Sequence, residues 1–266
     1  MSNPRLPVAL ALIAAVAAGV VWGPDLVVRL AIVHSHPYAL DRFYRQDVDW
    51  HACRETAPGI RVRCAEVTVP LDYSDPEGRT TTVAVARRPA TDTDHRIGTL
   101  LIDTGDRGGS FDGVRKVVEG APRVAARHDL VGVEPRAPVR TGAQDLDVVR
   151  SAVFEERISY LGWSGGGNLG AGYAQLFPRH VRRVVLDSAT SAPGDRSVPI
   201  SSDTPVLLIA GQPALHRQLT RSRLVTVSGA AQARARVYLH GGSRCVSKLV
   251  ERYLIDGQLP ATDATC

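Results

Sequence analysis

The stretch Ile158-Ser-Tyr-Leu-Gly-Trp-Ser-Gly-Gly-Gly167 decides the fold of this chain. The apolar run Ile158–Gly162 predicts a buried strand, and Asn168–Phe177 predicts the helix that follows it. Between them, Gly162-Trp-Ser-Gly-Gly166 has the pattern G-x-S-x-G, whose glycines leave room for a sharply turned serine beside a helix N-terminus. We therefore predict a nucleophile elbow at Ser164. A phosphate loop starting at Gly162 is the alternative, but Ser164 occupies its second glycine position and no Lys-Ser or Lys-Thr follows.

Short apolar segments that fit strands alternate with segments that fit helices along the rest of the chain. The first two strands pair around the turn Asp75-Pro-Glu-Gly78. This pattern predicts an α/β fold with a mostly parallel sheet and helices on both faces. The predicted strands are Ala65–Tyr73, Thr80–Arg87, Thr99–Asp103, Asp129–Val133, Ile158–Gly162, Val181–Asp187, Pro205–Ala210 and Leu224–Ser228. The predicted helices are Leu146–Val153 with its flanks, Asn168–Phe177 and Cys245–Leu254, the last stopped by Gly257.

Composition excludes several classes of protein. The 266 residues are 44% hydrophobic and 22% charged, which suits one packed α/β domain and argues against disorder. The net charge is +5, and nearly all basic residues are arginines, since the only lysines are Lys116 and Lys248. The basic residues form no run longer than two. We therefore expect no nucleic-acid partner. No cofactor and no metal are predicted.

The N-terminus has the pattern of an export segment. Arg5 precedes a near-continuous apolar run from Leu6 to Trp22 that contains small residues. Residues 1–22 are predicted to be a signal peptide or, alternatively, an uncleaved anchor, which would be the chain's only membrane contact. Residues 23–47 are predicted as a linker and residues 48–266 as the folded domain, in a secreted or extracytoplasmic protein.

The four cysteines fall as two local pairs. An even number of cysteines behind an export segment indicates disulfides. Of the three possible pairings we predict Cys53–Cys64 and Cys245–Cys266, because each closes a short loop. A zinc site is the competing interpretation, but the close Cys-x-x-Cys spacing typical of such sites is lacking.

A serine nucleophile also needs donors for an oxyanion. The backbone N–H of Gly165, directly after the serine, would be one donor. The second should come from a loop after an earlier strand, and the segment Thr104-Gly-Asp-Arg-Gly-Gly-Ser110 is suitably placed. We predict Asp106 as the residue that supplies it, with an ordinary glycine-rich turn as the alternative.

Several segments together resemble the secreted bacterial tripeptidyl aminopeptidase-like α/β-hydrolases, which are serine peptidases. The resemblance spans about residues 48–266 and implies an α/β-hydrolase fold and hydrolysis of peptides, amides or esters. The matching segments are Trp50–Cys53, Cys64–Tyr73, Val131–Arg136, Asp145–Arg150, Ile158–Ser164, Tyr173–Pro178, Val184–Asp187 and, near the end, Cys245, Tyr253-Leu254, Asp256-Gly257, Leu259-Pro260 and Cys266.

The chain departs from this family at functional positions. The family carries a large helical lid where this chain has only the 17 residues Ser188 to Thr204. In the family, the acidic residue of the catalytic triad follows the strand matched by Pro205–Ala210. In this chain the corresponding segment, Gly211-Gln-Pro-Ala214, holds no carboxylate. The family's histidine position corresponds to Ala235. A serine without a base stays protonated and reacts poorly.

Two residues could replace the missing partners. His240 lies in the loop between the last strand and the last helix, and Asp187 ends the strand after the elbow helix, so Ser164, Asp187 and His240 keep the chain order Ser–Asp–His. One hypothesis is therefore an exported serine hydrolase with Ser164 as nucleophile, His240 as base and Asp187 as acid. The other is a catalytically impaired pseudo-hydrolase that binds a ligand or partner.

Overall fold

The computed structural model describes residues 39–55, 57–105, 108–189, 204–210, 213–228, 237–240 and 243–266. The chain divides into a short unit, Met1–Arg42, and a larger unit, Phe43–Cys266. Helix α3 (Asp41–Tyr44) spans the boundary, and the sheet with its covering helices belongs to the larger unit. The predicted signal or anchor, residues 1–22, lies outside the described residues. No helix in the described part combines the length and apolarity needed to cross a bilayer.

Over the described residues, ten strands form one sheet in the order β1-β2-β3-β5-β4-β6-β7-β8-β9-β10. The first three pairings, from β1 to β5, are antiparallel, and every pairing from β5 to β10 is parallel. The strands are β1 (His51–Ala52), β2 (Arg63–Pro70), β3 (Thr80–Arg88), β4 (Gly98–Asp103), β5 (His128–Val133), β6 (Ile158–Trp163), β7 (Val181–Asp187), β8 (Val206–Ile209), β9 (Ser222–Thr226) and β10 (Ala264–Thr265).

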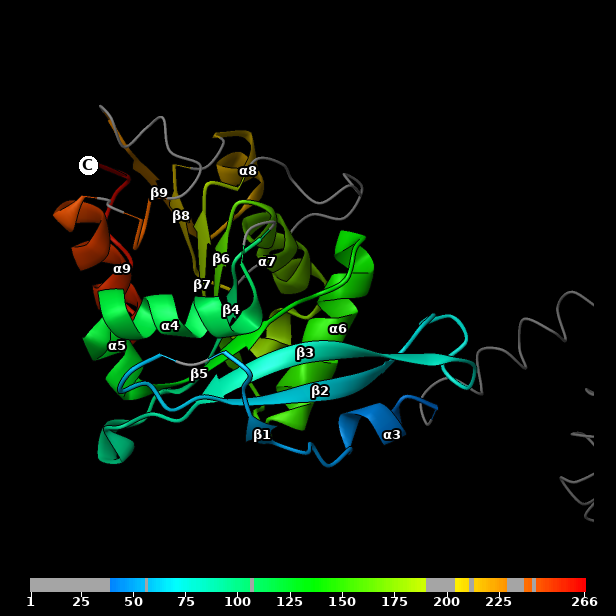
Figure 1. Ribbon diagram of the computed structural model, residues 1–266. Helices are drawn as coiled ribbons and strands as arrows, with labels where there is room; N and C mark the ends of the chain where they lie inside the picture. Colours follow the sequence, from blue (N-terminus) through cyan, green and yellow to red (C-terminus); the bar gives the residue numbers. More distant parts are fainter. Residues whose placement is uncertain are drawn as a thin grey trace, which may run out of the picture. The chain divides into compact units, whose positions relative to one another are not determined.

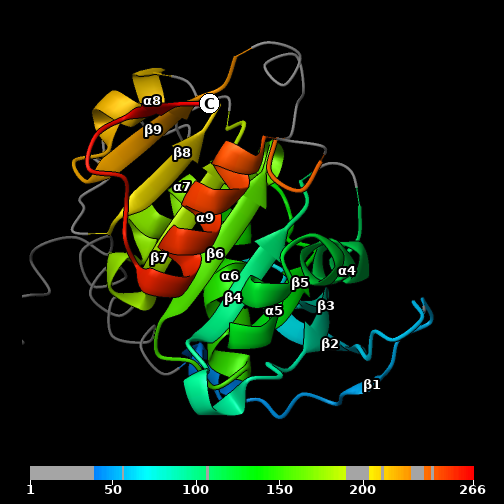
Figure 2. The ribbon, with the colours of Figure 1, turned by 90° about the vertical axis from the view of Figure 1, so that its left-hand side faces the viewer.

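Helices cover both faces of the parallel part, as predicted. Figures 1 and 2 show α4, α5 and α9 on one face of the sheet and α6 and α7 on the other. Because both faces are covered, every residue of β4, β5 and β6 is buried. The helices are α4 (Ser110–Gly120), α5 (Pro122–Arg127), α6 (Val139–Ala152), α7 (Gly165–Leu176), α8 (Pro213–Gln218) and α9 (Arg244–Asp256), with 3₁₀ turns at Thr93–His95 and Pro178–His180.

The predicted elements are mostly confirmed, and their ends differ for identifiable reasons. Helix α9 begins after Ser243, whose hydroxyl accepts from the Cys245 amide, and ends at Gly257, which adopts φ 73°. The flank of helix α6 before Leu146 extends back to Val139, and the polar residues in these first turns obscure the apolar period there. Helix α7 begins at Gly165, three residues before the predicted start. Its first three residues are glycines, whose low helix propensity does not predict a helix there.

Side chains also tie down the edges of the sheet. On the outer side of β2, the Gln46 side chain donates to the Thr68 carbonyl and accepts from the Thr68 amide, each at 2.8 Å. Both cysteine pairs lie at disulfide distance as predicted, with Cα–Cα separations of 4.9 Å for Cys53–Cys64 and 5.7 Å for Cys245–Cys266. The second pair joins the start of α9 to the end of the chain, beside β10.

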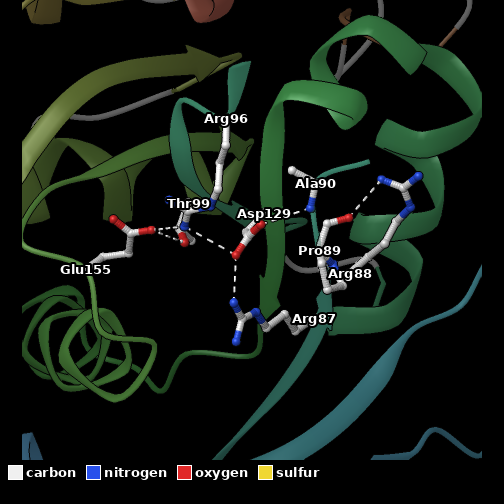
Figure 3. A network of polar contacts seen from close by, with 8 residues as sticks. All are labelled: Arg87, Arg88, Pro89, Ala90, Arg96, Thr99, Asp129 and Glu155. Atoms are coloured by element: carbon white, nitrogen blue, oxygen red, sulfur yellow. Dashed lines mark hydrogen bonds and ion pairs between the residues drawn. The ribbon is translucent and has the colours of Figure 1, made fainter. Parts of the chain in front are cut away.

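A polar network centred on the buried Asp129 lies where β4, β5 and β6 begin (Figure 3). Asp129 accepts from Arg87 at 2.6 Å, from Arg96 at 3.3 Å and from the Ala90 amide at 2.9 Å. Arg96 also pairs with Glu155. Burial alone would raise the pKa of Asp129, but the Ala90 amide and the two guanidinium groups outweigh it and hold that pKa below its usual range. This network links β3, β5 and the residues before β6 at the end of the sheet opposite Ser164.

Candidate active site

Ser164 lies between β6 and α7, in the strand–turn–helix setting that the sequence predicts. Its backbone angles are φ 54° and ψ −117°, a region that costs a non-glycine residue about 1–3 kcal/mol. Its amide donates to the Asp187 carbonyl at 2.8 Å, which ties the turn to the neighbouring strand. A Cβ on Gly166 would lie 2.7 Å from the main-chain oxygen of Asp103, so only glycine fits there. The elbow geometry is confirmed, and the nucleophilic role of Ser164 stays a prediction.

Backbone strain is concentrated where three adjacent parallel strands end. Ser164 follows β6, Ser188 follows β7 with φ 58°, and Ala210 follows β8 with φ 47°. Each of the three amides donates to the next strand along the sheet, at 2.8 to 2.9 Å. Strained non-glycine residues cluster at functional sites when the surrounding structure holds them. The carboxyl ends of these strands are therefore the candidate active-site edge.

A pocket of about 530 Å³ opens beside the elbow, within the size range of small-molecule sites. Gly165 and Gly166, the first residues of α7, line it together with Gly105 and Gly108 from the loop after β4. The amides at the start of α7 give this wall a positive potential, because they have no partner within the helix. This part of the wall therefore offers main-chain N–H groups of the kind that bind an anionic oxygen, whereas Asp103 and Glu134 add negative charge elsewhere in the wall.

The glycine-rich loop after β4 packs directly on the elbow. Gly105 has φ +65°, and a Cβ there would lie 2.5 Å from the Trp163 carbonyl and 3.2 Å from the amides of Gly165 and Gly166. This close approach is what a loop that contributes an oxyanion donor requires. Asp106, the predicted second donor, lies outside the described residues, so its role stays a prediction.

Two carboxylates in the pocket wall were not identified from the sequence. Asp103 ends β4 and accepts from the Gly105 amide at 2.8 Å and from the Tyr160 hydroxyl at 3.2 Å. Burial and the charge of Asp103 raise the pKa of Tyr160 well above its usual value, so that hydroxyl remains a donor. Glu134 follows β5 and accepts from the Ser110 amide at 2.7 Å. Acidic residues directly after apolar strands were the available signal.

An ion pair holds Arg136, which lines the pocket. Arg136 donates to both oxygens of Asp145, at 2.9 and 2.7 Å, and Asp145 also accepts from the Tyr73 hydroxyl at 2.9 Å. The hydrogen bond to Asp145 raises the pKa of Arg136. Both Tyr73 and the segment Val131–Arg136 belong to the stretches that carry the family resemblance.

The structure brings Asp187 and the turn carrying His240 together. Asp187 is fully buried, and its Oδ2 accepts from the amides of Val237 and Tyr238 at 2.9 and 2.7 Å. His240 stands edge-on to Trp163, with ring centroids 5.6 Å apart, and its Nδ1 lies 3.0 Å from the Tyr238 carbonyl oxygen. The ring nitrogen that a triad acid would orient therefore meets a main-chain carbonyl. The catalytic roles predicted for Asp187 and His240 stay predictions.

Comparisons with known proteins show which proteins this chain resembles. The family model described as "TAP-like protein" matches residues 192–266. The serine protease Hip1 of Mycobacterium tuberculosis is 28% identical over 214 residues, which cover 56% of this chain and 41% of that protein. The tripeptidyl aminopeptidase of Streptomyces lividans is 31% identical over 222 residues, covering 59% and 41%. The chain thus spans about two fifths of the length of these relatives.

Two solved structures share the fold. Est1E from Butyrivibrio proteoclasticus superposes with a TM-score of 0.52 at 13% identity, covering 72% of this chain and 98% of that chain. A predicted CIB-like hydrolase from Thermoplasma acidophilum gives a TM-score of 0.50 at 14% identity, covering 79% and 98%. At these identities the likeness concerns the fold, which is that of the α/β-hydrolases.

Proposed function

We propose that this chain, which is similar to TAP-like proteins, is a serine hydrolase that cleaves peptides or small amides and esters through an acyl-enzyme on Ser164. The observation that carries this proposal is the strained turn of Ser164 beside a pocket lined by Gly165. A sharp turn that raises a serine over the amides of a following helix suits acyl transfer.

The proposed reaction has two steps. Ser164 Oγ attacks the substrate carbonyl while Nε2 of His240 takes its proton, and the resulting oxyanion is stabilised by the Gly165 N–H. The C–N or C–O bond then breaks, and the proton passes from His240 to the leaving group. Water repeats the sequence on the acyl-enzyme and releases the acid and free Ser164.

A fluorophosphonate probe tests the proposal, because it reacts only with an activated serine. We expect labelling of the folded protein that disappears in Ser164→Ala. Ser74→Ala, which removes an exposed hydroxyl in the turn after β2, should label like the wild type. A folded protein that takes no label would refute the hydrolase proposal.

The second candidate function is ligand binding without turnover. It is favoured by the sequence Gly211-Gln-Pro-Ala214 and by Ala235, which leave the family's acid and histidine positions unfilled. In that case a tripeptide p-nitroanilide should raise the melting temperature while no nitroaniline is released. Release that depends on Ser164 would exclude it.

We also propose an extracytoplasmic location. All four cysteines lie in pairs at disulfide distance, and disulfides persist in oxidising compartments. The apolar N-terminal run supports export. Cell fractionation with non-reducing mass analysis tests this, and reduced protein in the cytoplasmic fraction would contradict it.

A further inference from the structure

We infer that Asp187 is a positioning residue whose carboxylate holds the turn at residues 237–240 through main-chain amides, so that His240 is oriented by the Tyr238 carbonyl. The inference rests on the proposed function, and it assigns Asp187 a role other than that of the acid in a Ser–Asp–His triad. Two groups of contacts carry it.

The first group shows what the buried carboxylate holds. Besides the two amides at Oδ2, the Ser188 hydroxyl donates to Oδ1 at 2.7 Å. Hydrogen bonds to a charged acceptor are stronger than those between neutral groups. Asp187 also touches the elbow, because its main-chain oxygen accepts from the Ser164 amide. One residue therefore joins the turn of the nucleophile to the turn of the histidine.

The second group shows why the histidine turn needs holding. Leu239 has φ +62°, which lies in the left-handed region that strains a non-glycine residue. The bend brings the His240 ring back over the Tyr238 carbonyl, which also accepts from Trp163 Nε1 at 3.0 Å. The hydrogen bonds that the amides of Val237 and Tyr238 donate to Asp187 lie just before the strained Leu239, so they fix the start of the bend. Without these two hydrogen bonds, fewer contacts would offset the backbone strain at Leu239.

This arrangement determines which nitrogen of His240 can act as a base. A carbonyl oxygen only accepts, so the contact with Tyr238 places the ring proton on Nδ1 and leaves the lone pair on Nε2. That tautomer is the one a general base needs. Asp187 thus acts on His240 indirectly. It holds the amides of Val237 and Tyr238, and the carbonyl of the same turn, that of Tyr238, orients the His240 ring.

Two substitutions at Asp187 separate positioning from direct acid function. In Asp187→Asn the side-chain oxygen can still accept from Val237 and Tyr238, whereas Asp187→Ala removes both bonds. A positioning role predicts that the Asn variant keeps kcat/KM on nitrophenyl acetate within about 10-fold of the wild type and keeps its pH profile. A triad acid predicts a loss of about 10⁴-fold in the Asn variant. Asp263→Asn is the matched control, since Asp263 also accepts from a main-chain amide, that of Leu224, at 2.9 Å.

A spectroscopic readout tests the inference even if the protein hydrolyses nothing. Nitrogen-15 spectra of His240 should show the Nδ1–H tautomer in the wild type and in Asp187→Asn, and hydrogen exchange should show protected amides at Val237 and Tyr238. If Asp187→Ala folds, it should lose both signatures. If it does not, the Asn variant decides alone. An Nε2–H tautomer in the wild type, or one that appears in Asp187→Asn while the two amides stay protected, would overturn the inference. Absent labelling by the fluorophosphonate probe would overturn only the proposed function.

Discussion

The amide of Ser110 donates to the Glu134 carboxylate over 2.7 Å, which ties the start of α4 to the residue after β5. Ser110 closes the glycine-rich loop that packs on the elbow, and a Cβ on Gly109 would lie 2.8 Å from the same carboxylate oxygen. Glu134 therefore clamps one end of the loop that should complete the oxyanion site.

Replacing Glu134 should lower activity through this clamp. We expect Glu134→Ala to reduce kcat/KM on nitrophenyl acetate by about 10-fold or more, because the loop donor is then poorly placed. Glu134→Gln keeps an oxygen that accepts from Ser110 and should stay within a few-fold of the wild type. Equal losses in the two variants would mean that the charge of Glu134, rather than the clamp, matters.

Two glycines with similar positive φ values should respond differently to substitution by alanine. Gly105 has φ +65° and contacts the elbow, whereas Gly59 has φ +75° and nothing within 4 Å of an added Cβ. Gly59→Ala should cost only the conformational term, about 1–2 kcal/mol of unfolding free energy. Gly105→Ala should cost more and should also slow labelling of Ser164. Urea denaturation measures the loss of unfolding free energy in each variant. Equal losses in Gly59→Ala and Gly105→Ala would show that the close approach of Gly105 to Trp163 is unimportant.

Substituting His240 tests its role as base. His240→Ala should lower kcat/KM on nitrophenyl acetate by 10²-fold or more, as Ser164→Ala does, because both belong to one catalytic unit. His95→Ala, at an exposed histidine outside the site, serves as control. Unchanged activity in His240→Ala would remove this residue from the mechanism.

Buried His128 should make the fold sensitive to acid. Burial, only partly offset by the contact of its Nδ1 with the Val124 carbonyl, lowers the pKa of His128 to about 4. The unfolded chain, in which histidine titrates near 6.5, binds more protons between these values, so stability falls as pH drops from about 6.5 to 4. The loss should approach about 3 kcal/mol, measured by urea denaturation across this range. His128→Gln should flatten the dependence, whereas a profile as steep as that of the wild type would contradict this origin.

Each disulfide should stabilise the fold by about 3 kcal/mol in the chain-entropy model. Replacing Cys245 and Cys266 by serine should lower the melting temperature and free the end of the chain beside β9. Peptide mapping without reduction should find only the pairs Cys53–Cys64 and Cys245–Cys266. A link between Cys64 and Cys245 would contradict the pairing.

The sequence predicts the sheet well where apolar strands are covered on both faces, and poorly where packing overrides local preference. Helix α4 escaped prediction because it begins at Ser110, directly after the glycine-rich loop, and contains Gly113. A Cβ on Gly113 would lie 3.0 Å from Ile102, so the residue that weakens the helix locally is needed for its close packing on β4. Strands of two residues, such as β1 and β10, give no periodic signal at all.

The site was predictable to the extent that its geometry is local. The G-x-S-x-G pattern specifies the turn at Ser164 because all its steric demands lie within five residues. The partners of Asp187 lie about 50 positions away, in a turn whose conformation depends on Leu239, Trp163 and the carboxylate together. Such long-range placement leaves no pattern in the chain itself.

The side chain of Gln46 has a consequence for how the protein behaves among copies of itself. A strand at the edge of a sheet offers unpaired amide and carbonyl groups to which another molecule can add. On β2, whose pairing with β1 covers only Arg63 and Cys64, Gln46 occupies both main-chain groups of Thr68 as a further strand would. A strand from another molecule would have to displace Gln46 before it could pair with β2 at Thr68, so this side chain should oppose edge-to-edge association.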